Sequence, residues 1–397
     1  MIMNALYLEN GQIQLRTDYP EPQPGPGEAL IAVTLAGVCS TDLELVKGYL
    51  PFTGVLGHEF VGEVTAVGPP ENVGQASLLD RANRDVCATD VESVAGTPLA
   101  HVDSPENVGQ ASLLDHANRD VCATDVESVA GTPLAHVDFP QTDSDWLGRR
   151  VVGTINLGCG RCPVCLAAGA EHCPQRTVLG IAGKDGVFAQ YVTLPVTNLL
   201  PVPDDVTDEQ AVFTEPLAAA LRIREQVAVR PTARTAVVGP GRLGLLIGQV
   251  LALGGGQVTM LGRSAASLAL PARLGLTTGL TTDFADNSFD FVVEATGNAA
   301  GLAQSLRLVR PQGTLVLKST FAGEASLNLT KLVVAEINVI GSRCGPFAPA
   351  LRLLARREVD VLASVDGRYP LHQAPAALDH AARPGIRKIL IECRDRG

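Results

Sequence analysis

The chain has 397 residues, of which 46% are hydrophobic and 18% are charged. A chain of this length and apolar content can bury two cores, which excludes disorder over most of its length. Its 31 Lys and Arg residues against 42 Asp and Glu give a net charge of −11, which argues against nucleic acid or an anionic membrane as a partner.

The first residues contain no basic stretch followed by an apolar core. We therefore expect no secretory signal and a cytoplasmic location, where the nine cysteines would be metal ligands or buried thiols rather than disulfides. The most apolar later stretch, 235–262, contains Pro240, Arg242 and many glycines. This pattern predicts a strand, a turn and a helix rather than a membrane span.

Apolar runs between Gly and Pro turns predict a β-rich N-terminal region. A stiff proline-rich loop at 20–27 precedes the run 29–35, and a second run follows at 61–67. Both have the length and composition of strands.

Residues 70–104 are followed at 105–139 by a near-copy that differs at only two of 35 positions. The two copies hold 12 acidic and three basic residues, so we interpret 70–139 as a recently duplicated acidic insert in a nearly neutral chain. The simpler interpretation is a surface excursion of the host domain. A partner-binding surface is the alternative.

Four cysteines follow in one short segment, at Cys159, Cys162, Cys165 and Cys173. Spacings of three, three and eight residues within one loop suit a closed, tetrahedral structural zinc site. Because a reducing compartment disfavours disulfides, the sequence predicts a zinc lobe over 159–173.

From residue 235 the pattern changes to alternating strands and helices, which predicts a parallel, doubly wound sheet. Strands are predicted at 235–238, 257–261, 289–294, 314–318 and 338–341, with helices ending at 253 and spanning 268–274. A further helix at 348–356 and a terminal strand at 388–392 follow.

Gly239, Gly241 and Gly244 form a Gly-x-Gly-x-x-Gly motif between a predicted strand and a predicted helix. In that context the motif predicts a dinucleotide site, with the pyrophosphate at the helix N-terminus. A plain strand-to-helix turn is the alternative.

The second predicted strand of this sheet ends in Gly262, Arg263 and Ser264, where an NAD-specific site usually has Asp or Glu. Without a carboxylate there, Arg263 and Ser264 can bind a 2′-phosphate, so NADP is favoured over NAD. In the alternative, Arg263 stacks on adenine and either nucleotide is accepted.

Other polar residues are dispersed along the chain: Cys39, Thr41, Asp42, His58, Glu59 and Glu215. On spacing alone each is a core or surface residue. Their order relative to the four cysteines and the glycine motif changes that interpretation. Together these motifs resemble the zinc-dependent medium-chain alcohol dehydrogenase family, in particular its polyol, threonine and glucose dehydrogenase branches.

The resemblance covers about 4–68 and 141–391 and implies an α/β fold. It implies a GroES-like, β-rich catalytic domain built from 1–215 and 342–397, with a Rossmann domain at 216–341. The insert falls in a catalytic-domain loop, where added length costs little closure entropy, so we expect the fold to survive.

By the same resemblance, Cys39, His58 and Glu215 are catalytic zinc ligands, and Glu59 is a possible alternate ligand. One thiolate, one imidazole and one carboxylate leave a fourth position open. Asp42 would hold His58, and Thr41 would pass the substrate proton toward solvent. Thr296 is a cofactor candidate beside the nicotinamide ribose, with a simple strand terminus as the alternative.

The implied function is hydride transfer between a nicotinamide cofactor and an alcohol, a polyol or the corresponding carbonyl, with two zinc ions per chain. We expect a small-molecule substrate and a homo-oligomer, with no nucleic-acid or membrane partner. The alternatives are a catalytically silent scaffold that uses the acidic insert as an interaction surface, and a zinc-free reductase, in which the ligand residues would be missing.

Overall fold

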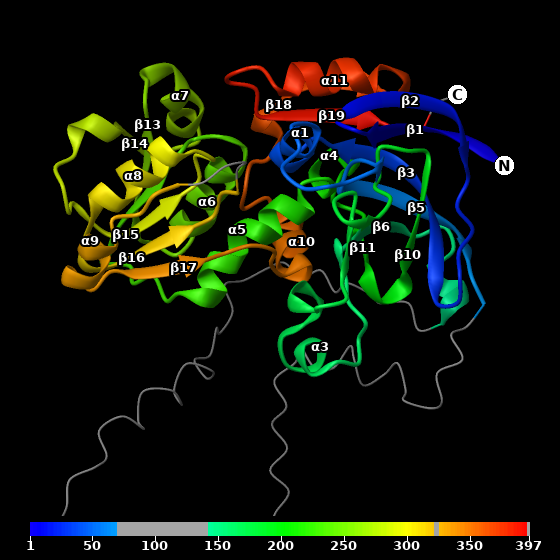
Figure 1. The fold of residues 1–397 in the computed structure, drawn as a ribbon, viewed down its shortest axis with the longest axis horizontal. Coiled ribbons are helices and arrows are strands. Elements are labelled where there is room, and N and C mark those ends of the chain that lie inside the picture. Colours follow the sequence, from blue (N-terminus) through cyan, green and yellow to red (C-terminus); the bar gives the residue numbers. More distant parts are fainter. Residues whose placement is uncertain (70–141, 321–324, 395–397) are drawn as a thin grey trace, which may run out of the picture. The chain divides into compact units, whose positions relative to one another are not determined.

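We describe residues 1–69, 142–320 and 325–394 of a computed structural model (Figure 1). By their contacts the described residues belong to one compact unit, which lies within Met1–Glu71 and Ala135–Gly397. The insert predicted at 70–139 lies outside the described residues, so everything below concerns this unit.

The chain opens with a β-hairpin. Strands β1 (Ile2–Glu9) and β2 (Gln12–Pro20) pair antiparallel across Asn10 and Gly11, whose φ angles are 51° and 75°. An Asn-Gly pair with positive φ at both positions is the preferred two-residue hairpin loop, because its twist matches that of the strands. Strand β4 (Gly54–Val55) pairs with β1 and completes a three-stranded sheet.

Both ends of the chain build the second sheet. It runs in the order β11 (Leu199–Pro201), β6 (Arg150–Gly153), β5 (Glu59–Val67), β3 (Glu28–Gly37), β19 (Lys388–Glu392) and β18 (Val365–Pro370), and β10 (Tyr191–Pro195) also pairs with β3. Leu390 pairs antiparallel with Gly37, so the last strand closes on an early one. Helix α11 (Ala374–Ala381) lies along β18 and β19 (Figure 1). This confirms the predicted β-rich domain.

The segment with the four cysteines lies between short strands. Strands β7 (Asn156–Leu157), β8 (Thr177–Leu179) and β9 (Gly183–Lys184) form a three-stranded sheet. Helix α3 (Pro163–Ala168) lies within the lobe, and none of its residues is buried. Apolar packing therefore contributes little to the shape of this helix.

The predicted parallel sheet is present with six strands. It runs in the order β14 (Thr277–Leu280), β13 (Gln257–Gly262), β12 (Arg234–Val238), β15 (Phe289–Glu294), β16 (Val309–Leu317) and β17 (Asn338–Gly341). All five pairings are parallel. Its connecting helices are α6 (Arg242–Ala252), α7 (Ala265–Arg273), α8 (Ala299–Leu308) and α9 (Leu329–Val334).

Successive residues of the central strands bury opposite faces of this sheet. Val237 and Val293 join the apolar cluster that contains α6, whereas Val238 and Val292 join the cluster that contains α8. Because side chains alternate along a strand, helices on both faces require a run that is apolar at every position. The run of valines in β12 and β15 meets that requirement.

Two helices join the parallel sheet to the second sheet. Helix α5 (Thr214–Gln226) and helix α10 (Phe347–Ala355) share one apolar cluster with Val237 of the parallel sheet and with Leu35 and Leu390 of the sheet that contains β3 and β19. The N-terminus of α5, which carries Glu215, is therefore fixed against both sheets. The remaining short helices are α1 (Ser40–Val46) and α4 (Asp208–Ala211). Within the described ranges, no helix has the length and apolarity needed to cross a bilayer.

Candidate metal centres and dinucleotide site

Cys39 and Asp42 form the start of α1. The backbone N–H of Cys39 donates to Oδ2 of Asp42 at 2.8 Å, an arrangement that caps the helix. The other carboxylate oxygen of Asp42, Oδ1, lies 3.3 Å from Nδ1 of His58, although that contact lacks hydrogen-bond geometry. Asp42 is fully buried, so one carboxylate holds the backbone of Cys39 and lies against the ring of His58.

Cys39, His58 and Glu59 bring their ligand atoms within 4.8 Å of one another. His58 and Glu59 are both buried. Burial opposes the charged form of His58, but Asp42 and Cys39 outweigh this effect and raise the pKa of the imidazole. A thiolate, an imidazole and a carboxylate at this spacing are a donor set that suits Zn²⁺.

Glu59 also has a cationic partner that the sequence did not reveal. Its Oε2 forms an ion pair with Nζ of Lys388, and both side chains are buried. Lys388 lies on β19, and its ammonium is also 5.3 Å from the ring centre of Phe213. Neutralising a buried carboxylate in this way avoids the large cost of an isolated buried charge.

Glu215 lies beside this cluster but outside the group of three. Burial raises the pKa of Glu215, while His58 lowers it and Glu59 raises it, so both side chains act electrostatically on its carboxylate. Thr41 also lies at the cluster, since its Oγ1 is 3.7 Å from Sγ of Cys39. The predicted residues are thus gathered in one place, and Glu59 is in closer reach of Cys39 and His58 than Glu215 is.

The four predicted lobe cysteines also meet within 4.8 Å. Their sulfurs approach in two pairs at 3.9 Å, Cys159 with Cys165 and Cys162 with Cys173, and all four thiols are free of disulfides. The backbone N–H groups of Arg161 and Cys162 lower the pKa of Cys159 to about 6. Thiolates are the form that binds zinc, so the site fits that ion.

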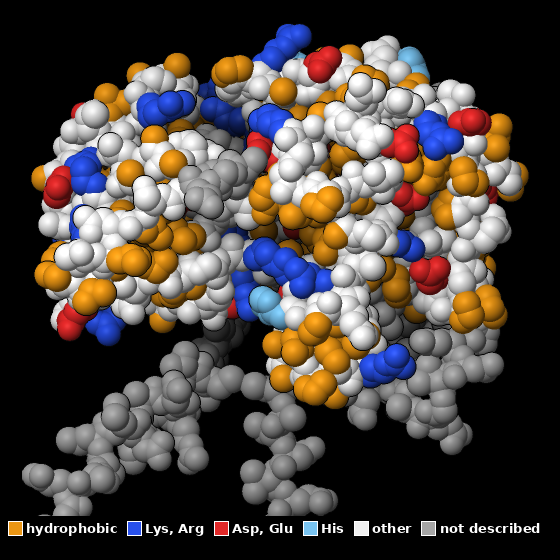
Figure 2. Space-filling model, viewed as in Figure 1, with side chains coloured by type: hydrophobic (Ala, Val, Ile, Leu, Met, Phe, Trp, Pro, Cys, Tyr) orange, Lys and Arg blue, Asp and Glu red, His pale blue; other side chains and the backbone are white. Residues whose placement is uncertain are grey.

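This lobe exposes apolar side chains rather than burying them. Hydrophobic side chains gather over α3 on the viewed face (Figure 2), where Leu166 is 60% exposed. Of the four cysteines only Cys173 is buried. Little apolar burial and four sulfurs at this spacing fit a lobe that a bound metal ion would cross-link.

The predicted dinucleotide residues lie along the carboxyl edge of the parallel sheet. Gly239 follows β12 with a φ of 105°, and a Cβ there would meet Ala295 O at 2.6 Å. A Cβ on Gly244 would collide with the backbone of Gly239, whereas one on Gly241 would meet nothing within 4 Å. Glycine is therefore required at two positions, and the third leaves open space at the N-terminus of α6, which fits a bound pyrophosphate.

Gly262, Arg263 and Ser264 lie at the end of β13, on the same edge. Arg263 and Ser264 are exposed. The hydroxyl of Ser264 accepts the N–H of Ser267 at 3.4 Å and caps α7. Arg263 forms no hydrogen bond or ion pair with another described residue, so its guanidinium faces solvent.

Thr296 is held by a residue that the sequence did not single out. Its backbone N–H and its hydroxyl both donate to Oε1 of Glu294, at 2.6 and 2.5 Å. Glu294 is buried and ends β15. The hydroxyl of Thr296 is therefore already hydrogen-bonded to Glu294, and this contact fixes the turn at 295–297 at the carboxyl edge of the parallel sheet.

Lys318 is a buried cation at the end of β16 that the sequence also did not reveal. Its Nζ donates to Ser342 Oγ at 3.1 Å and to Arg343 O at 2.6 Å. Burial lowers the pKa of Lys318 to about 8, although Glu215 and Cys344 act in the opposite direction. A lysine directly after an apolar strand is the only sequence signal for it.

Replacing Lys318 by methionine is expected to change how stability depends on pH. Between the folded pKa of about 8 and the ordinary value of 10.5, the unfolded chain holds a proton that the folded chain has lost, so wild-type stability rises with pH. That rise amounts to about 3 kcal/mol and should be absent in K318M. Urea unfolding of both proteins across this range measures it. K47M, at a side chain that is 64% exposed, is the control, and parallel wild-type and K318M profiles would contradict the assignment.

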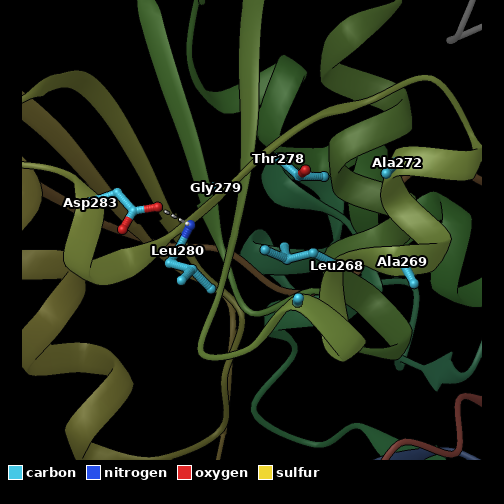
Figure 3. A pocket seen from close by; sticks show the side chains of 8 residues that line it. Leu268, Ala269, Ala272, Thr278, Gly279, Leu280 and Asp283 are labelled. Atoms are coloured by element: carbon cyan, nitrogen blue, oxygen red, sulfur yellow. Dashed lines mark hydrogen bonds between the residues drawn. The ribbon is translucent and has the colours of Figure 1, made fainter.

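A pocket of about 270 Å³ lies between α7 and β14 (Figure 3). Leu268, Ala269 and Ala272 line it from the helix, and Thr278 and Leu280 line it from the strand side. Asp283 closes the strand end by accepting the N–H of Leu280 at 3.2 Å. None of the predicted metal-binding or nucleotide-binding residues lines this pocket, so we assign it no role in either site.

Comparison with known proteins agrees with this geometry. The model of the alcohol dehydrogenase GroES-like domain matches 25–94 and 135–204, and the model of the zinc-binding dehydrogenases matches 243–356. The chain belongs to the zinc-dependent medium-chain alcohol dehydrogenase family. It is therefore an oxidoreductase of the alcohol dehydrogenase type, as the motifs predicted.

Similar proteins extend over almost the whole chain. An L-galactonate-5-dehydrogenase of Escherichia coli is 24% identical over 93% of this chain and 92% of its own length. A sorbitol dehydrogenase of Halalkalibacterium halodurans is 26% identical over 92% and 91%. A zinc-binding dehydrogenase of Sinorhizobium meliloti, solved with NADP, superposes with a TM-score of 0.73 at 25% identity and covers 99% of each chain.

Proposed function

We propose that this chain is a zinc-dependent dehydrogenase that uses NADP in preference to NAD and acts on a polyol or a related hydroxy compound. The observation that carries the proposal is the cluster of half-buried Cys39 with buried His58 and Glu59, which has Asp42 and Glu215 beside it. A binding scaffold has no physical need for such a donor set, and a zinc-free reductase would lack it.

Each residue of the cluster has a separate role in the proposal. When bound, zinc would act as a Lewis acid on the substrate oxygen and the nicotinamide would exchange the hydride. Cys39, His58 and Glu215 would hold the metal, while Glu59, paired with Lys388, would enter or leave its coordination. Asp42, whose Oδ1 lies against Nδ1 of His58, would leave Nε2 to hold the metal, and the hydroxyl of Thr41, near Cys39 Sγ, would take the substrate proton.

The nucleotide preference rests on the end of β13. No carboxylate stands at Gly262, Arg263 or Ser264 to bond ribose hydroxyls or to repel a 2′-phosphate. Arg263 is exposed and has no partner among the described residues, so its guanidinium is available for a charge-assisted contact. The Sinorhizobium meliloti relative was solved with NADP, whereas other solved structures of this fold contain NADH or NAD, so the preference rests on the end of β13.

The substrate class rests on the relatives and on Glu215. The similar enzymes named above are a galactonate and a sorbitol dehydrogenase, and a carboxylate as third metal ligand suits such hydroxy-rich substrates by family analogy. We further propose two zinc ions per chain, a domain division at about 216 and 341, a homo-oligomer and a cytoplasmic location.

Replacing Arg263 by alanine is expected to weaken NADPH binding about tenfold or more while leaving NADH binding within about twofold. Nucleotide fluorescence titrations on zinc-loaded protein, with metal content measured in the same preparations, provide the test. Equal losses for both nucleotides would contradict the 2′-phosphate contact. A wild-type protein that bound neither nucleotide and only one zinc would favour the scaffold hypothesis.

A further inference from the structure

Arg242 directly follows Gly241, the second glycine of the Gly-x-Gly-x-x-Gly motif, and is the first residue of α6. Its backbone belongs to the parallel-sheet domain, at the point where the open space beside Gly241 lies. Its side chain, however, does not stay in that domain. This separation between backbone and side chain is what makes the residue informative.

The guanidinium reaches two elements of the catalytic domain. Nη1 donates to Oγ of Ser40 at 3.1 Å, and Nη2 donates to the carbonyl oxygen of Ala381. Ser40 directly follows Cys39 and begins α1, whereas Ala381 ends α11. One side chain thus connects the phosphate loop to the segment that carries a proposed zinc ligand.

These two contacts leave the guanidinium only partly satisfied. An arginine side chain has five N–H donors, and the described residues use one on Nη1 and one on Nη2. Nε is buried without a hydrogen-bond partner in the same set of residues. Burial lowers the pKa of Arg242, whereas Cys39, Glu59, Asp42 and Asp366 raise it, and arginine keeps its charge throughout.

The adjoining helix N-terminus adds to the positive potential. The N-cap of α6 is Gly241, which has no side chain to accept the first N–H groups, and the first turn contains no acidic residue. Unpaired N–H groups and the helix dipole therefore face the open space beside Gly241. The Arg242 guanidinium, its free N–H donors and the uncapped N-terminus of the 11-residue helix α6 thus lie together. A bound anion would neutralise this positive charge.

We propose that Arg242 binds the pyrophosphate of the dinucleotide while it remains anchored to Ser40 and Ala381. This inference rests on the proposed function, since it needs a dinucleotide at the glycine motif. The phosphate oxygens would take the N–H donors that the two anchors leave free. The contact would join the cofactor to the Cys39 segment, so that Arg242 orients the nucleotide relative to the metal cluster.

The test separates the two phosphates of NADP. ADP-ribose contains the pyrophosphate but no 2′-phosphate, and adenosine 2′-monophosphate contains the 2′-phosphate but no pyrophosphate. R242Q should raise the dissociation constant of ADP-ribose about 10- to 100-fold and leave that of adenosine 2′-monophosphate within about twofold. R263Q should raise the dissociation constant of adenosine 2′-monophosphate and leave that of ADP-ribose within about twofold. Competition against NADPH fluorescence measures both without turnover.

Two further variants sharpen the result. R242K keeps a positive charge but loses the planar fork, so its ADP-ribose affinity should fall between those of wild type and R242Q. S40A removes one anchor and should weaken ADP-ribose binding by a few-fold, but much less in the R242Q background. Retained binding of adenosine 2′-monophosphate shows that R242Q is folded.

Three results would overturn the inference. R242Q that binds ADP-ribose within about twofold of wild type would exclude the pyrophosphate contact, and equal weakening of both ligands would show a general structural effect instead. In either case wild-type NADPH binding stays intact and the proposed function stands. If wild type binds none of NADPH, NADH and ADP-ribose, the proposed function itself has failed.

Discussion

The E215A variant is expected to lose turnover by about 1,000-fold or more and to retain one zinc instead of two. Without the carboxylate, the catalytic metal would keep only Cys39 and His58 as firm ligands, and the several kcal/mol that a Lewis acid contributes would be lost. The four-cysteine lobe is separate from Glu215, so its zinc should remain. Metal content and steady-state rates on polyol substrates measure the two losses.

E59A is the matched control for this prediction, because it removes the other carboxylate of the same cluster. Glu59 already has a partner in Lys388, so we expect E59A to retain two zincs and to lower the rate less than E215A does. The opposite pattern, with zinc lost from E59A and kept by E215A, would make Glu59 the resident ligand. Unchanged activity of E215A would refute its role.

The charges around this cluster explain why buried Asp42 and Glu59 and half-buried Glu215 can lie together. Asp42, Glu59 and Glu215 are balanced from three directions by Lys388 on β19, Lys318 after β16 and Arg242 on α6. Each cation comes from a different element, and none is adjacent in sequence to the acid it faces. A metal would add further positive charge and lower the cost of burial again.

Much of the fold is predictable from the sequence because its signals are local. The predicted strands 289–294, 338–341 and 388–392 are confirmed as β15, β17 and β19. Strand β14 was not predicted, because Thr277–Leu280 is short, lies at the sheet edge and has no buried residue. An edge strand without a buried face leaves little apolar signal to read.

The site was only partly predictable, for a physical reason. The four cysteines lie close together in one short segment, and the three glycines lie close together in another. Each spacing is therefore visible in a single sequence. The pairing of Glu59 with Lys388 joins residues 329 positions apart, and Arg242 meets Ser40 across 202. Such contacts are created by the fold, and no periodicity or spacing records them.

Replacing Cys173 by alanine is expected to empty the four-cysteine lobe of zinc and to loosen it, while the catalytic zinc stays. Cys173 is the only buried residue of the four, and α3 has no buried side chain to hold its place. Because metal binding contributes folding energy directly in such sites, removing one sulfur should cost several kcal/mol. Zinc content, the thermal midpoint and proteolysis near α3 measure the effect.

C393A provides the control, since Cys393 is also buried but belongs to neither candidate metal site. Its Sγ lies 3.5 Å from the carbonyl oxygen of Val187. It should keep two zincs and lose only the free energy of unfolding that a small cavity costs, about 1 kcal/mol. If C173A retained both zincs, or if C393A lowered the thermal midpoint equally, the stability of the lobe would come from packing. The exposure of Leu166 on α3 argues that it comes from the metal, because a helix without a fully buried side chain gains little stability from packing.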